Sequence, residues 1–255
     1  MGSRNCEGPS GPSFFFDNLS AARPFSQPED ASRRKSPFLA LPLLLAAGAA
    51  LASDEVTHPF STAAPRGHVR RVVIDIPAGE VRIRNGAGDR ITVNGTAERH
   101  FDGHRRRSNE QEIVNDISAE VVVNGDEAII RRRFGPNAQS WSARSFHSSV
   151  DMSIELPPGV DVVVNTRYGA VNIDGAFGSI DTDLRAGEVH VRTPRANVRD
   201  LTASVSIGEV RTYFGDHYIE NEGVFPRVAR FHNASGRSDV NVRSTFGEVH
   251  VTLTN

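Results

Sequence analysis

Four glutamates are each followed, two residues later, by a cationic or titratable nitrogen side chain. In an extended strand such positions point to the same side, so each pair shares one outward face. If the strands stack about 4.8 Å apart, the cations offset repulsion between neighbouring glutamates. Two interpretations follow: a solvated charge ladder that keeps this face soluble and in register, or a ligand-binding stripe that responds to histidine protonation. The pairs are Glu80 with Arg82, Glu188 with His190, Glu209 with Arg211, and Glu248 with His250.

Aromatic residues are concentrated in two irregular stretches, residues 131–149 and 213–231. Exposed aromatic rings bind sugars or protein partners, whereas buried ones cap the apolar ends of a repeat stack. Trp141 stands in a polar stretch between two serines, which favours a binding role for it. The candidate binding residues are therefore Trp141, Phe146, Glu188, His190, Glu248 and His250.

Catalytic and metal-binding motifs are weak. Asp174, Asp181, Asp183 and Glu188 offer oxygen ligands for Ca²⁺, but without an EF-hand or a glycine-rich calcium repeat. His100 and His104 have the helical spacing of zinc ligands, yet three arginines follow them. We therefore predict no metal and no cofactor. The enzyme alternative is a glycosidase or lyase that uses Asp181, Asp183 and Arg185.

A glycine repeat must position these side chains. A glycine is followed by a short strand-like segment at Gly79, Gly169, Gly187, Gly208 and Gly247, and the last four are 18, 21 and 39 residues apart. These spacings are close to one, one and two units of about 20 residues, the period of stacked β-coils. We predict an all-β fold, a β-solenoid that turns at glycines. Its core stripe is predicted to contain Val171, Val189, Val205, Val210, Val240 and Val249.

The first half of the domain carries signals for hairpins. Asn94-Gly95 and Asn124-Gly125 separate alternating apolar runs and predict tight turns. Residues 121–123 and 128–131 are expected to pair across the second turn. Residues 107–118 offer a short helix, and residues 72–83 and 152–164 both predict strand, proline-glycine turn, strand.

The N-terminal part predicts export. Basic residues 33–35 precede an apolar run from Pro37 to Leu51, and small residues at Ala50 and Ala52 fit a signal-peptidase site. We expect a signal peptide with a long n-region over residues 1–52, or alternatively an uncleaved membrane anchor. A linker is expected over 53–68. One domain is expected over 69–255, with hairpins in 69–164 and regular repeats in 165–255.

The cysteine and charge content of the expected mature chain exclude further classes of function. Cys6 lies upstream of the expected cut, so the mature chain would contain no thiol. It would carry 24 arginines and no lysine against 27 carboxylates, a net charge of −3 (24 − 27), which argues against nucleic-acid binding.

Residues 70–255 resemble the bacterial putative-adhesin repeat proteins, a family with glycine-acidic-valine repeats on a β-solenoid. The resemblance rests on Gly79-Glu80-Val81, residues 156–160 (LPPGV) and the Gly-Glu-Val copies at 187, 208 and 247. This chain has Glu where the family usually has Asp.

The family is one of unknown function, so the functional prediction rests mainly on the export signal and the weak catalytic motifs: a non-catalytic, exported cell-envelope protein, secreted or periplasmic, that acts as an adhesin or structural module. Its expected partner is a cell-surface polysaccharide or a protein, with the chain a monomer or associated end to end. The alternatives are the carbohydrate-active enzyme and a self-assembling envelope scaffold.

Overall fold

The structure, a computed structural model, describes residues 55–100, 110–139 and 148–255. These residues form one mixed, open sheet of twelve strands, so the all-β prediction is confirmed. The only α-helix in these ranges, α1 (Glu110–Asn115), lies within the segment predicted as a short helix. The strands are β1 (Glu55–Pro65), β2 (Arg71–Asn85), β3 (Arg90–His100), β4 (Ile117–Asn124), β5 (Glu127–Phe134), β6 (Ser148–Leu156), β7 (Asp161–Asp174), β8 (Ile180–Pro194), β9 (Val198–Phe214), β10 (His217–Ile219), β11 (Arg227–His232) and β12 (Ser238–Thr254).

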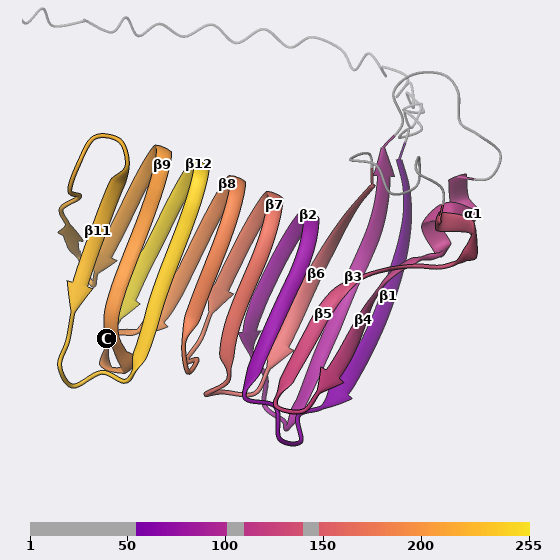
Figure 1. The fold of residues 1–255 in the computed structure, drawn as a ribbon, viewed down its shortest axis with the longest axis horizontal. Coiled ribbons are helices and arrows are strands. Elements are labelled where there is room, and N and C mark those ends of the chain that lie inside the picture. The colour runs from indigo at the N-terminus through magenta and orange to yellow at the C-terminus, as the bar shows by residue number, and fades with distance from the viewer. Residues whose placement is uncertain (1–54, 101–109, 140–147) are drawn as a thin grey trace, which may run out of the picture. The chain divides into compact units, whose positions relative to one another are not determined.

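Five long parallel strands form the centre of the sheet, in the order β2, β7, β8, β12, β9. Each bends at one glycine, so that it contributes a near limb before the bend and a far limb after it (Figure 1). Side chains alternate between buried and exposed along both limbs. The buried sets of the two layers form a single core, and the exposed sets form two outer faces.

The glycines at the bends are required by both conformation and space. Their φ angles lie between +128° and +143°, a region that side-chain-bearing residues rarely adopt. They also align across the sheet, so a Cβ on Gly187 would lie 1.8 Å from the carbonyl oxygen of Gly169. The same 1.8 Å separates a Cβ on Gly247 from the oxygen of Gly187. The repeated glycine therefore marks a corner where neighbouring backbones meet directly.

The valine two residues after each corner forms a continuous buried column. Val171 pairs with Val189, Val189 with Val249, and Val249 with Val210, and all four are fully buried. The other two residues of the predicted stripe, Val205 and Val240, are also buried, but they lie before the corner, in the near layer. The predicted core stripe is thus buried as expected, but it comprises positions from both layers.

The order of the repeats in space differs from their order in sequence. β12 lies between β8 and β9, so Gly247 contacts both Gly187 and Gly208. The spacing of 39 residues does not represent two coils, because the chain leaves β9 to form β10 and β11. Both of these strands pair antiparallel with β9 on its outer side.

Two proline- or glycine-containing turns were predicted at positions that lie within strands. Asn94-Gly95 belongs to the middle of β3, where the absence of a side chain on Gly95 leaves room for the ring of Phe60. Pro77 and Gly79 lie within β2, at its bend. By contrast, the turn at residues 157–160 separates β6 from β7, and Asn124-Gly125 connects the β4–β5 hairpin, as predicted.

The expected linker over 53–68 is also wrong, because residues 55–65 form β1. This strand pairs antiparallel with β3 along its whole length, and β3 in turn pairs with β6. At this end of the sheet β5 continues the near limb of β2 and β6 continues its far limb (Figure 1).

Candidate functional site

The far layer carries the glutamates and nitrogen side chains that the sequence singled out. Register places Glu188 beside Glu248, and Glu248 beside Glu209. One step along the same face, His190 lies beside His250, and His250 lies beside Arg211. We call these two rows, extended through β7 to Glu80 and Arg82 of β2, the Glu/His ladder.

Each expected pair makes contact within its own strand. Arg211 donates two hydrogen bonds to the Glu209 carboxylate, at 2.8 and 2.6 Å, and Arg82 donates one to Glu80. The histidine pairs are looser. Nε2 lies 3.1 Å from the carboxylate in His250–Glu248 and 3.4 Å in His190–Glu188. The two histidine pairs are therefore easier for a ligand to displace than the arginine pairs.

Contacts also connect neighbouring strands of the ladder. The rings of His190 and His250 stack with centroids 4.8 Å apart. Asn172 of β7, which occupies the nitrogen row, donates from Nδ2 to Glu80 at 2.9 Å. These contacts hold the side chains as a flat, ordered surface.

The Arg211–Glu209 pair fixes the charge at the β9 end of the ladder. The hydrogen bond from Arg211 holds the pKa of Glu209 below its ordinary value, and Glu209 in turn raises the pKa of Arg211. Glu209 therefore remains ionised at neutral pH. The ladder contains four carboxylates and two arginines, so the surface is net acidic when both histidines are neutral.

A groove of about 440 Å³ runs beside the ladder. His190 and His250 line it, together with polar and cationic side chains from β2, β6, β7, β8 and β12. Arg84 in its wall is already paired, since its Nε donates to Glu155 at 3.1 Å. The remaining polar side chains of the lining are Arg82, Ser153, Asn172, Asp174, Arg192 and Thr252.

The other predicted site residues are not part of this groove. Trp141 and Phe146 lie outside the described residues. Asp181, nominated for catalysis, accepts a hydrogen bond from Asn241 at 3.0 Å, and only Asp183 and Arg185 of that triple line a cavity. Within the described ranges, no group of three or more metal-ligating side chains occurs.

The aromatic stretch from 213 to 231 divides between the two roles considered for it. Phe214 and Phe231 pack against the core, and the Arg195 guanidinium lies over both rings, 3.9 and 5.6 Å from their centroids. These rings cover the β9 end of the core, which is a capping role. Phe225 instead is 71% exposed.

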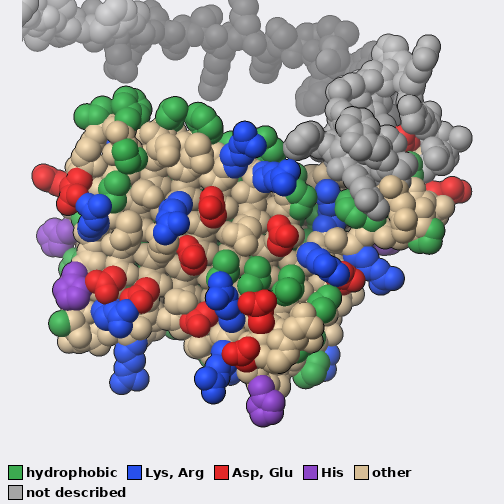
Figure 2. All heavy atoms as spheres, in the orientation of Figure 1, with side chains coloured by type: hydrophobic (Ala, Val, Ile, Leu, Met, Phe, Trp, Pro, Cys, Tyr) green, Lys and Arg blue, Asp and Glu red, His purple; other side chains and the backbone are tan. Residues whose placement is uncertain are grey.

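The edge of the sheet at the corners is apolar, in contrast to the two charged faces. Register aligns Tyr168, Phe246 and Ile207 just before the glycines, and all three are exposed. Figure 2 shows hydrophobic side chains along this upper edge and charged ones of both signs across the near face.

Sequence reasoning missed a second cavity, on the near face, that contains Arg132, Arg167 and Asp183. Its sequence signals are Asp183 and Arg185, nominated only as part of a catalytic triple, and the run Arg131-Arg132-Arg133, which is typical of a solvated strand face. That interpretation is wrong for Arg132, because alternation along β5 places Arg132 on the inward side with the buried Ile130.

Comparisons with known proteins identify no family. No family model and no curated protein matches the chain. Among solved structures, a "putative cell adhesion protein" from Clostridium sporogenes is 9% identical, with a TM-score of 0.43 over 78% of this chain and 100% of the other. A "putative adhesin" from Parabacteroides merdae is 5% identical, with a TM-score of 0.27 over 62% and 64%.

A "putative lipid binding protein" from Parabacteroides distasonis is 7% identical, with a TM-score of 0.22 over 76% of this chain and 96% of the other. All three scores are too low to support an argument about fold or function. No helix among the described residues has the length and apolar character needed to cross a membrane.

Proposed function

We propose that this chain is a non-catalytic, exported β-solenoid of the cell envelope that binds a neutral cell-surface polysaccharide along the Glu/His ladder. The observation that carries the proposal is the in-register alignment of Glu188 with Glu248 and of His190 with His250 beside a groove. It provides repeated hydrogen-bonding groups at a constant spacing of about 4.8 Å.

The chemistry of the ladder favours hydroxyl groups over charged ones. Carboxylates accept hydrogen bonds from hydroxyls, and a neutral imidazole both donates and accepts. Along the ladder itself, four carboxylates against two arginines repel an anionic polymer, whereas the groove beside it is lined by three arginines and one aspartate. A neutral polysaccharide, which presents hydroxyls at a regular repeat along an extended chain, fits this surface best.

A protein partner is less favoured because protein interfaces depend on buried aromatic or aliphatic anchors. The apolar residues that line the groove, Ile83, Ile173 and Val191, are at most 2% exposed. These three side chains are therefore not available to such an anchor.

Three features support the remaining parts of the proposal. The parallel, in-register strands bent at stacked glycines support the proposed solenoid. The apolar run 37–51 with its basic flank supports export. The arginine-held carboxylate of Glu209 is poorly suited to proton transfer, which supports a binding rather than a catalytic role.

A monomer is favoured over end-to-end association. β11 and β10 cover β9 at residues 200–205 and 212–214. Between them, the Nδ2 of Asn221 donates to the carbonyl oxygen of Val210 at 2.6 Å. The edge of β9 is therefore largely occupied, which hinders the addition of a strand from a second copy.

Affinity electrophoresis in gels that contain dextran, mannan, galactan or a soluble β-glucan tests the function. At least one neutral polymer is expected to retard the protein, and the His190→Ala/His250→Ala variant should lose this retardation. His217→Ala is the matched control, since His217 is exposed on β10 and pairs with Phe214, outside the two rows of the ladder.

The proposal fails if none of these neutral polymers retards the protein. It also fails if the ladder variant and the control are retarded equally. Preferential retardation by polygalacturonate that depends on His190 and His250 would reverse the charge argument.

A further inference from the structure

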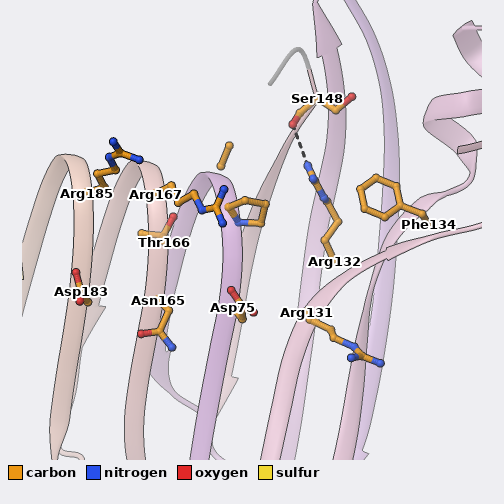
Figure 3. Close-up of a pocket in the computed structure, with 12 residues that line it drawn as sticks. Asp75, Arg131, Arg132, Phe134, Ser148, Asn165, Thr166, Arg167, Asp183 and Arg185 are labelled. Atoms are coloured by element: carbon orange, nitrogen blue, oxygen red, sulfur yellow. Dashed lines mark hydrogen bonds between the residues drawn. The ribbon is translucent and has the colours of Figure 1, made fainter. Parts of the chain in front are cut away.

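A second groove, of about 630 Å³, lies on the near face, between β5 and the near limbs of β2, β7 and β8. Its volume is within the range of small-ligand sites. In Figure 3, Arg132 extends from β5 toward Ser148, and Arg167 and Arg185 project from β7 and β8. Asp75, Asn165 and Asp183 form a row below them.

Three of the four arginines that line this groove form no ion pair with a carboxylate of the described residues. Within the described residues, no carboxylate forms an ion pair with Arg132, Arg167 or Arg185, whereas Arg131 is paired with Glu120 at 2.6 Å. The lining holds four arginines and two aspartates, so the groove is cationic, opposite in sign to the ladder.

Arg132 is the most unusual of these cations. Its Nη1 donates to the Ser148 carbonyl oxygen at 3.1 Å, and its guanidinium carbon lies 4.5 Å from the centroid of the Phe134 ring. Its Nε is buried and has no hydrogen-bond partner in the part of the chain that the structure describes. Burial also lowers its pKa from the ordinary value, because desolvation penalises the charged form. A bound anion would compensate this charge.

The remaining polar groups indicate what else the ligand carries. Thr166 also lines the groove, and its buried hydroxyl has no hydrogen-bond partner among the described residues. Asp75, Asn165 and Asp183 present acceptors on three adjacent strands, across about 10 Å. A row of this width matches several hydroxyls on a ring better than it matches a single ammonium group.

We propose that this groove binds an anionic sugar residue, with its carboxylate held by Arg132, Arg167 and Arg185 and its hydroxyls bound by Asp75, Asn165 and Asp183. The site is separate from the Glu/His ladder, which lies on the far layer, so it does not depend on the proposed function. It would give the protein a second specificity, for acidic sugar units.

Isothermal titration of the full-length chain with trigalacturonate tests this site. The fully methyl-esterified trisaccharide removes the charge and keeps the rings, and inorganic phosphate supplies a simple anion. We expect trigalacturonate to bind, and Arg167→Gln and Arg185→Gln each to weaken it by about tenfold or more, since each removes a charge-assisted hydrogen bond. Both side chains are exposed, so these variants are expected to fold.

Arg133→Gln is the matched control, because it removes the same charge from an exposed position on β5 outside the groove. Its affinity for trigalacturonate, and that of His190→Ala/His250→Ala, should equal that of the wild type. The inference is overturned if trigalacturonate does not bind, if its ester or phosphate binds equally well, or if Arg133→Gln weakens binding as much as Arg167→Gln does.

Discussion

The Gly187→Ala substitution tests whether backbone contact at the corners is what requires glycine. Two costs add. An alanine at φ +138° occupies a conformation that costs about 1–3 kcal/mol. Its Cβ also lies 1.8 Å from the Gly169 oxygen, and the forced separation of two packed strands costs about 1–3 kcal/mol more. The expected loss is therefore about 2–6 kcal/mol, a large part of the stability of an ordinary domain.

Gly67→Ala isolates the conformational cost. Gly67 has φ +53°, and a Cβ there would meet no atom within 4 Å. Its expected loss is about 1–2 kcal/mol. Urea denaturation followed by circular dichroism compares the two variants with the wild type. Equal unfolding free energies for Gly187→Ala and Gly67→Ala would refute the steric part of the argument.

Three further changes have expected outcomes. Thr182 lies between Val164 and Val242 in its column, and its buried hydroxyl has no partner among the described residues. Thr182→Val should therefore raise the unfolding free energy by about 1 kcal/mol. An unfolding free energy below that of the wild type in urea denaturation would contradict this. Glu110 forms a buried ion pair with Arg99, with 2.8 Å between Nε and Oε2. Glu110→Ala should lower the unfolding free energy by about 3–5 kcal/mol, because it leaves the Arg99 charge unpaired. A loss below about 1 kcal/mol would show that the pair is solvated. The pKa of Asp200 is held below its ordinary value, mainly by the hydrogen bond from His232. This carboxylate therefore contributes stability that is lost only as the pH falls through its lowered pKa. An NMR titration should show a higher pKa of Asp200 in His232→Ala, and an unchanged pKa would contradict the assignment.

The local structure of the repeats could be predicted from the sequence, but their order in space could not. Glycine followed by Glu-Val fixed the corner, the buried valine and the outward pair, because strand alternation depends only on neighbouring residues. Val189, Val210 and Val249 are interchangeable in that pattern, so it gives no information on which strands are adjacent. The position of β12 between β8 and β9 depends on the whole β10–β11 connection.

β1 was missed for a related reason. Two prolines and weak alternation suggested a linker, yet prolines are tolerated in an edge strand, where one side needs no ladder hydrogen bonds. Pro59 and Pro65 lie in β1, which among the described strands pairs with β3 alone. Absence of a two-residue period therefore did not exclude a strand at the edge.

The two grooves differ in how far the sequence reveals them. The ladder side chains recur at a fixed offset from glycine, so their common face could be predicted. The near-face groove combines residues from β2, β5, β7 and β8 that share no motif. In particular, Arg132 and Arg167 approach the same cavity only because β5 pairs with β2 at residues 71–75 and β7 pairs with its other side.

The most direct test of the central claim is an NMR spectrum of the histidine rings during titration with a neutral polysaccharide that retards the protein. The account predicts that the ring signals of His190 and His250, stacked in the ladder, shift together and saturate. The signals of His217 and His232, on β10 and β11, should remain in place. Binding that leaves the His190 and His250 signals unchanged would contradict the assignment of the ladder as the binding surface.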